Sequence, residues 1–187
     1  MQGFIEDLLK LSSIAISGRP FQTVNLQTLA QEVAEDLEAW IAQSNVKLNI
    51  DHLPTLEADA TQMRQLLQNL IGNALKYHRD GVPPVVTVTS RPLRDGFWEI
   101  MVRDNGIGIE PHLISRIFQP FERVHSGDLF KGSGMGLAIC KKIVGRHGGS
   151  IHVASQPNKG TSFIVTLPEQ HKAPRNRNVP SPQVSPA

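Results

Sequence analysis

Two carboxamides, a lysine and a tyrosine recur at helical spacing between residues 65 and 78. Each residue of a helix turns the chain by about 100°, so one stripe of a helix here would carry Asn69, Asn73, Lys76 and Tyr77. Carboxamide oxygens are neutral ligands that suit Mg²⁺, which keeps waters and substrate phosphates in its shell. A lysine ammonium beside them attracts phosphate. Without other motifs, such a stripe is more often a solvated helix face.

A carboxylate precedes two alternating glycines in Asp104-Asn-Gly-Ile-Gly-Ile109, directly after a predicted strand. Gly106 and Gly108 allow the backbone to turn sharply and to approach a flat ligand closely. Asp104 can accept a hydrogen bond from an exocyclic amine such as that of adenine. The same residues also occur in an ordinary Asp-Asn-Gly turn, so this motif indicates a nucleotide site only when the other motifs occur with it.

A third glycine motif, Lys131-Gly-Ser-Gly-Met-Gly-Leu137, leads directly into a predicted helix. Gly132, Gly134 and Gly136 would expose backbone N–H groups where a helix N-terminus favours anions. The spacing fits neither a Walker P-loop nor the G-x-G-x-x-G motif, which excludes both assignments. The polar stretch 122–131 before it is predicted to act as a lid, with residues 117–121 as its apolar anchor.

The elements that position these motifs follow from hydrophobic periodicity and turn residues. The predicted helices cover residues 1–16, 26–41, 59–78 and 111–118, and a last helix begins at 136 and ends near 148–149. The predicted strands cover 21–25, 46–50, 85–90, 98–103, 150–154 and 162–167. Asp95-Gly96 predicts a hairpin. Strands interleaved with helices predict an α/β two-layer sandwich, in which helices cover a mixed β-sheet.

Composition limits the classes of function. The 187 residues contain no stretch approaching the ~18 apolar residues that span a bilayer and no predicted secretory signal, so we expect a cytoplasmic protein without direct membrane contact. The net charge of +2 resides in residues 168–187, and the neutral remainder argues against a nucleic-acid partner. The single cysteine, Cys140, excludes an internal disulfide and is predicted to be buried.

The motifs also occur in an informative order. Asn-x-x-x-Asn-Ala-x-Lys-Tyr, Asp-x-Gly-x-Gly, Phe-x-Pro-Phe and Gly-x-Gly-x-Gly-Leu follow one another within residues 20–168. This set resembles the histidine-kinase ATPases of the GHKL superfamily, which also contains type II topoisomerases, mismatch-repair proteins and ATP-dependent chaperones. The sequences of residues 68–74, 121–125 and 140–149 look closest to those of phytochrome-linked sensor kinases. The resemblance implies a Bergerat-type fold with ATP and Mg²⁺ as cofactors.

The resemblance assigns roles to the residues of the motifs. It implies that Asn73 coordinates Mg²⁺ with support from Asn69, that Lys76 reaches the phosphates, and that Tyr77 lines the pocket. Asp104 is expected to bind the adenine amine, with Gly106 and Gly108 shaping that wall. The remaining expected ATP contacts are Gly132, Gly134, Gly136, Leu137 and Thr161, with Arg123, His125 and Lys131 as weaker phosphate candidates.

One position bears on the type of reaction. ATPases of the superfamily place a glutamate, the general base for water, where this chain has Asn69, which cannot take a proton at neutral pH. The resemblance therefore favours a kinase over a plain ATPase or an anti-sigma type serine kinase. A non-enzymatic nucleotide-binding module that regulates a partner kinase remains the alternative from another class.

In the resembled family the acceptor histidine lies on the first helix of a helical hairpin. None of the seven histidines has that context: His52, His78, His112, His125, His147, His152 and His171. Residues 1–19 resemble the second helix of the hairpin, so we expect an acceptor in a parent chain or in trans, a homodimer through residues 1–16, and a response regulator as the next partner. Residues 169–187 are predicted to be a disordered, proline-rich tail.

Overall fold

The computed structural model describes residues 19–43, 45–122 and 133–170. The predicted helix over residues 1–16 and most of the predicted tail lie outside the described residues. The described residues continue to residue 170, two positions beyond the predicted end of the domain at residue 168. There the N–H of Glu169 donates to Gly96 O at 2.7 Å, and Glu169 O accepts from Glu57 N at 2.9 Å.

A mixed five-stranded sheet forms one layer, as predicted. Its order is β2 (Lys47–Ile50), β4 (Val85–Pro92), β5 (Phe97–Asp104), β7 (Gly160–Pro168) and β6 (Ser150–Gln156). β2 runs parallel to β4, and every other neighbouring pair is antiparallel. The predicted hairpin joins β4 to β5 through a 3-10 turn in which Asp95 and Gly96 both have positive φ.

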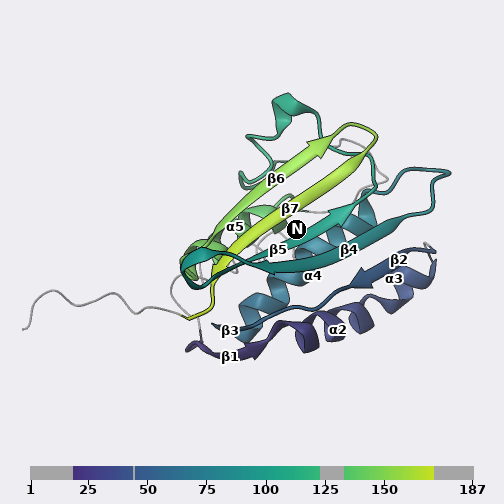
Figure 1. Ribbon diagram of the computed structural model, residues 1–187. Helices are drawn as coiled ribbons and strands as arrows, with labels where there is room; N and C mark the ends of the chain where they lie inside the picture. The colour runs from purple at the N-terminus through teal and green to yellow at the C-terminus, as the bar shows by residue number, and fades with distance from the viewer. Residues whose placement is uncertain (1–18, 44, 123–132, 171–187) are drawn as a thin grey trace, which may run out of the picture.

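Helices α4 (Ala60–Lys76) and α5 (Gly136–Arg146) cover one face of this sheet, with α2 (Leu26–Asp36) beside them (Figure 1). The apolar stripe of α4 is buried against inward-facing strand residues such as Val86 and Val102. Asp59 caps α4, since its Oδ1 accepts from the N–H groups of Thr61 at 3.1 Å and Gln62 at 3.2 Å. This confirms the predicted helix start, and it fixes the face on which the carboxamide stripe lies.

Three local predictions were wrong. The single helix expected over 26–41 is broken at Leu37 (φ −99°, ψ 4°), which ends α2 and begins the short α3 (Glu38–Gln43). The helix expected over 111–118 is only a 3-10 turn, Pro111–Leu113, followed by further turns closed by i→i−3 bonds, which is common where a segment is too short to sustain an α-helix. A strand was missed: β3 (Thr55–Ala58) pairs antiparallel with β1 (Gln22–Asn25).

Candidate active site

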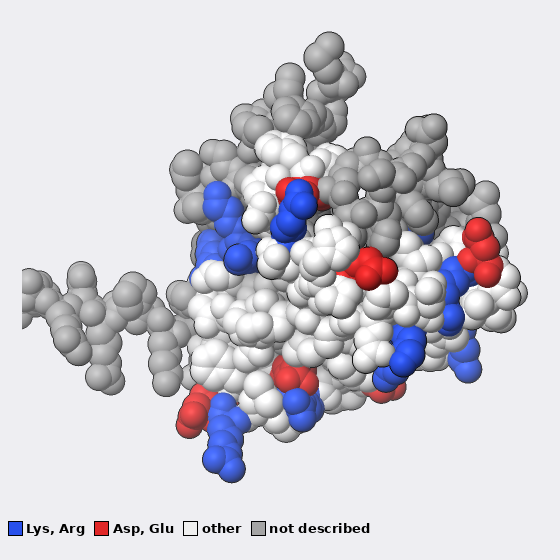
Figure 2. Space-filling model, turned by 90° about the horizontal axis from the view of Figure 1, so that it is seen from above, with Lys and Arg blue, Asp and Glu red and all other residues white. Residues whose placement is uncertain are grey.

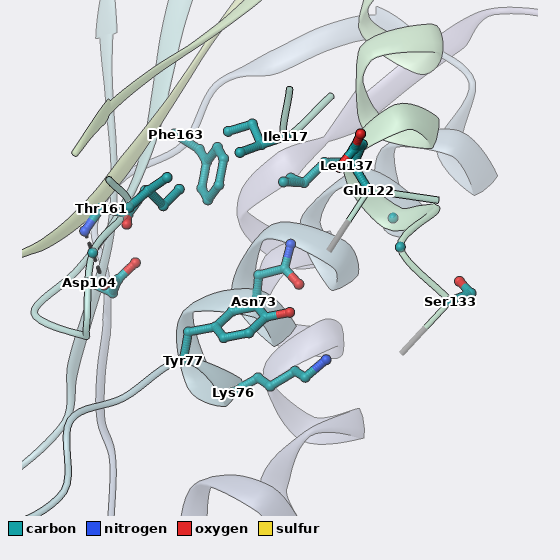
Figure 3. Close-up of a pocket in the computed structure, with 14 residues that line it drawn as sticks. Asn73, Lys76, Tyr77, Asp104, Ile117, Glu122, Ser133, Leu137, Thr161 and Phe163 are labelled. Atoms are coloured by element: carbon teal, nitrogen blue, oxygen red, sulfur yellow. Dashed lines mark hydrogen bonds between the residues drawn. The ribbon is translucent and has the colours of Figure 1, made fainter. Parts of the chain in front are cut away.

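The three motifs meet around one cavity of about 240 Å³ between the end of α4, the end of β5, the start of β7 and the start of α5 (Figure 3). Nine of the predicted site residues line it: Asn73, Lys76, Tyr77, Asp104, Gly108, Gly134, Gly136, Leu137 and Thr161. Five further residues complete the lining: Ile109, Ile117, Glu122, Ser133 and Phe163. Segments almost 90 positions apart in the sequence thus form a single pocket.

Asp104, the last residue of β5, is only 8% exposed at one wall of the cavity. Its Oδ1 accepts from the N–H of Gly106 at 2.8 Å and from the N–H of Thr161 at 3.1 Å. Figure 3 shows the other carboxylate oxygen pointing into the pocket. Burial raises the pKa of this carboxyl, and the two backbone donors oppose the rise. The carboxylate is held in one orientation and offers its free oxygen to a ligand.

The loop after Asp104 packs so closely against neighbouring backbone that Gly106 and Gly108 have no room for a side chain. A Cβ at Gly106 would lie 2.1 Å from Tyr77 O. Gly108 has φ of +70°, and a Cβ there would lie 2.0 Å from Gln156 O. Gly106 does not line the cavity itself, so it acts by letting the loop approach the end of α4. Gly108 belongs to the cavity wall.

Arg79 holds the same loop from outside and was not predicted. Its guanidinium donates to Asn105 O at 2.9 Å and to Asn158 O at 2.7 Å. The loop after β5 and the turn between β6 and β7 are therefore tied to the segment that follows α4. Nothing in the local sequence pattern indicated this bridge, because the three residues that form it are distant from one another along the chain.

The last turn of α4 supplies Asn73, Lys76 and Tyr77, which project toward the cavity in Figure 3. The ammonium of Lys76 lies 4.9 Å from the centre of the Tyr77 ring. Tyr77 is fixed at its backbone, where its N–H donates to Asn73 O and its carbonyl accepts from the N–H of Ile107, each at 3.0 Å. The predicted polar face of α4 is thus a wall of the pocket.

Asn69, one turn earlier, lies outside the cavity lining. Its Nδ2 donates to Gly136 O at 3.3 Å, at the start of α5. The same side chain hydrogen bonds with the buried thiol of Cys140. Asn69 therefore joins α4 to α5 in this structure, and its role toward a metal stays a prediction.

The expected lid is only partly described. Ser133, Gly134 and Gly136 line the cavity at the start of α5, and Glu122 lines it at the other end of the segment. An ion pair with Arg116, 2.8 Å long, holds Glu122. The remaining lid candidates lie outside the described residues: Arg123, His125, Lys131 and Gly132.

The apolar part of the lining was largely missed. Phe163 and Ile117 stand at the top of the cavity in Figure 3 and are both buried. A signal for Phe163 did exist, because alternate residues of a strand face the same side and Thr161 was predicted to face the pocket. Together with Ile109 these side chains form an apolar wall next to Asp104, which suits a flat ring with a polar edge.

The described residues contain no group of three or more His, Cys, Asp or Glu side chains that could hold a metal ion by themselves. Among the cavity-lining residues, Asn73 offers a side-chain carboxamide oxygen that could bind a metal together with ligand oxygens and waters. That donor set fits Mg²⁺, which is usually held by a few protein oxygens plus substrate phosphates.

Lys, Arg, Asp and Glu side chains are interspersed over the face shown in Figure 2, most of whose described surface is uncharged. This distribution gives no support to a nucleic-acid interface on that face. Among the described residues, no helix combines the length and the apolar character that crossing a membrane requires.

With this geometry in view, known proteins can be compared. Residues 58–171, well over half of the chain, match the model of the histidine kinase-, DNA gyrase B- and HSP90-like ATPases. The chain belongs to this family. Within it, the catalytic domain of the histidine kinase ThkA superimposes with a TM-score of 0.70 at 29% identity, covering 81% of this chain and 97% of that one. The chain therefore contains the ATP-binding catalytic domain of a histidine kinase.

Sequence relatives of this histidine kinase domain agree with the phytochrome-linked resemblance. Cyanobacterial phytochrome A of Nostoc sp. is 40% identical over 178 residues, which are 95% of this chain and 23% of that protein. The adaptive-response sensory kinase SasA of Synechocystis sp. is 34% identical over 178 residues, 90% of this chain and 45% of that protein. The chain thus spans only a quarter to a half of these relatives.

Proposed function

We propose that this domain binds Mg·ATP and transfers the γ-phosphoryl group to a histidine on a helical domain, from which a response-regulator aspartate receives it. The observation that carries the proposal is the placement of Asp104 and of the Asn73–Lys76 turn on two walls of one pocket. A nucleotide lying across that pocket has its base at the carboxylate and its phosphates at the carboxamide and the ammonium.

At the base end, the carboxylate of Asp104 accepts a hydrogen bond from the adenine amine. Its Oδ1 is already engaged by two backbone N–H groups, so the other oxygen is the acceptor. Thr161 lies beside it, and Phe163, Ile109 and Ile117 supply apolar contact for the ring. A ring without an amine at this position would leave a buried carboxylate oxygen unpaired, which disfavours it.

At the phosphate end, Asn73 binds Mg²⁺ through its carboxamide oxygen, and Lys76 binds phosphate oxygens. The backbone N–H groups around Gly134 and Gly136, at the start of α5, provide further donors for phosphate. Bound Mg²⁺ neutralises charge on the phosphates during transfer. Nucleotide binding is supported by the structure of full-length ShkA in complex with AMPPNP. That structure matches with a TM-score of 0.76 at 26% identity, and the match covers 92% of this chain and 36% of that one.

The acceptor is a histidine rather than water. Asn69 cannot remove a proton from water, and its side chain is occupied at the start of α5. Phosphoryl transfer needs mainly positioning of the reactants and electrostatic stabilisation of the transition state. An imidazole nitrogen carries a lone pair of its own, so it can attack the phosphorus without a general base. A response regulator as the next partner is supported by the structure of ThkA in complex with the response regulator TrrA, at 27% identity.

We also propose that residues 1–19 belong to the helical hairpin, that residues 20–168 are the catalytic domain, and that residues 169–187 are a tail. In this arrangement the hairpin supplies the acceptor and the dimer contact through residues 1–16. The whole protein acts in the cytoplasm.

The test is incubation of the chain with γ-labelled Mg·ATP, alone and with a separately made helical hairpin that carries the acceptor histidine. We expect acid-labile, base-stable label on the hairpin and negligible release of inorganic phosphate without it. Nucleotide binding with no label on the hairpin would favour the regulatory, non-enzymatic alternative. Rapid phosphate release by the chain alone would favour an ATPase.

A further inference from the structure

A second cavity lies on another side of α4, between α4 and the short helix α3. It measures about 360 Å³, and its lining includes Ala39, Trp40, Asn69, Gly72, Asn73 and Lys76. We propose that this α3–α4 groove docks the helix that carries the phosphoacceptor histidine, with Trp40 as the anchor. The inference rests on the proposed function, whose substrate it places at a particular surface.

The groove is continuous with the phosphate end of the nucleotide pocket. Asn73 and Lys76 line both cavities, whereas Asp104 and Thr161 line only the nucleotide pocket. In phosphoryl transfer the acceptor and the leaving oxygen lie roughly in line on opposite sides of the phosphorus. The acceptor must therefore arrive from beyond the phosphates, on the side away from the adenine. The α3–α4 groove adjoins that end of the pocket, because it shares Asn73 and Lys76 with it and does not include Asp104.

Trp40 gives the groove an apolar anchor. Trp40 is 49% exposed, and the other large hydrophobic residues with high exposure among the described residues are Leu93 and Phe121. Trp40 belongs to α3, which begins after the break at Leu37, and it lines the groove together with residues of α4. An exposed tryptophan beside a reaction site is typical of the few residues that dominate protein–protein affinity.

The floor of the groove contains Gly72, a glycine that no other feature of the fold explains. Gly72 lies in the middle of α4, where glycine weakens a helix relative to alanine. Its φ is not in the left-handed region, and a Cβ there would meet no atom within 4 Å. Absence of a side chain at Gly72, together with the small side chain of Ala39 in the same lining, leaves room for a partner helix to approach α4 closely.

The walls of the groove are held in place before any partner arrives. Arg64 of α4 pairs with both Glu32 and Asp36, one turn apart on α2, and the contact to Asp36 is 2.8 Å long. This double ion pair links the end of α2 to α4 just before the break at Leu37. A preformed surface loses little conformational entropy on binding, so a helix can dock without reorganising the nucleotide pocket.

The test uses the full chain and a fluorescently labelled two-helix hairpin with the sequence of the Nostoc relative's acceptor region. Its affinity is measured by anisotropy, separately from phosphoryl transfer and from the affinity for a fluorescent ATP analogue. The variants are Trp40→Ala, which removes the anchor, and Gly72→Gln, which fills the floor. Leu93→Ala and Gly145→Gln are the matched controls, since Leu93 is an exposed leucine of the β4–β5 turn and Gly145 is a helical glycine that also has open space.

We expect Trp40→Ala and Gly72→Gln to weaken hairpin binding roughly tenfold or more while ATP-analogue affinity and the thermal midpoint stay near those of the wild-type chain. The proposal is overturned if both variants bind the hairpin like the controls, if the wild-type chain does not bind it, or if nucleotide affinity falls in parallel. A change of oligomeric state in place of hairpin binding would assign the groove to a second copy instead. Binding that depends on Trp40 without any transfer of label would support the groove and contradict the proposed kinase activity.

Discussion

The backbone N–H of Thr161 donates to Oδ1 of Asp104 at 3.1 Å, although 57 positions separate the two residues. Asp104 ends β5, and the antiparallel register of β5 with β7 places Thr161 opposite it. The sheet therefore orients the carboxylate that faces the pocket. The same register places Phe163, two residues further along β7, on the same side of the strand.

Replacement of this carboxylate by a carboxamide tests the base end of the site. In Asp104→Asn the side-chain oxygen can keep the two backbone donors, which turns an NH₂ group toward the adenine amine. Two donors then face each other, and we expect the ATP-analogue affinity measured by titration to fall at least about tenfold. Asp51→Asn, at an exposed aspartate after β2, is the control. Equal affinities in the two variants would contradict the assignment.

Titration of Asp104 is expected to have opposite effects on ATP-analogue affinity and on the free energy of unfolding. Because burial raises its pKa above the unfolded value of about 3.9, its contribution to the free energy of unfolding is fully present below the unfolded pKa and is lost as the pH rises through the folded pKa. Binding runs the other way, because only the ionised carboxyl presents two acceptors. We expect ATP-analogue affinity to fall as the pH is lowered through the raised pKa, and this step to vanish in Asp104→Asn.

The same linkage predicts a stability gain in that variant. At neutral pH the wild-type domain buries a charge that Asp104→Asn lacks, so we expect the variant to unfold at an equal or higher temperature. The advantage should shrink as the pH falls and the wild-type carboxyl becomes protonated. Thermal unfolding monitored by circular dichroism across that pH range measures it. A variant that is less stable at neutral pH would show that the hydrogen bonds to Gly106 and Thr161 outweigh the burial of the charge.

The proposed binding of Mg²⁺ by Asn73 is tested by the Mg²⁺ dependence of ATP binding. We expect Asn73→Ala to lose the Mg²⁺ dependence of ATP binding, so that its affinity with and without EDTA is the same and resembles that of the wild-type chain in EDTA. The control is Gln65→Ala, which removes a carboxamide from the same helix outside both cavities. A wild-type response to Mg²⁺ in Asn73→Ala would exclude it as the ligand.

Cys140 provides a probe of the core. Burial raises the pKa of its thiol to about 12, against a weaker opposing effect of the Asn69 side chain. The reactive thiolate is therefore scarce at pH 8 and shielded from solvent as well. We expect no reaction with a thiol reagent such as DTNB in the native chain and one equivalent after unfolding in urea. Rapid native-state labelling would show that α4 and α5 separate readily.

Gly106 tests the close approach between the Asp104 loop and α4. A Cβ at this position would meet the Tyr77 carbonyl oxygen at 2.1 Å, so Gly106→Ala must displace the loop or the helix end. We expect a loss of about 1–3 kcal/mol in the free energy of unfolding, measured in urea, together with weaker ATP binding. Gly145→Ala, where a Cβ has open space, should instead be neutral or stabilising.

Local spacing was sufficient to predict most of the polar half of the site. The 100° turn of a helix places Asn73, Lys76 and Tyr77 on one face whatever surrounds it, and glycines at alternate positions after a strand indicate close backbone approach. The order of these motifs also indicated the family, which the comparison with known proteins confirmed. These features depend on neighbours within a few residues, which the sequence displays directly.

The features that only the tertiary structure decided depend on contacts between distant segments. The bridge of Arg79 to Asn105 and Asn158, the apolar wall of Ile117 and Phe163, and the pairing of β1 with β3 follow from which strands lie side by side. The break at Leu37, which separates the Trp40 helix α3 from α2, interrupts an apolar pattern that continues from α2 into α3. Periodicity shows which side of a segment is buried, but packing against the rest of the domain decides where the segment bends and what it contacts.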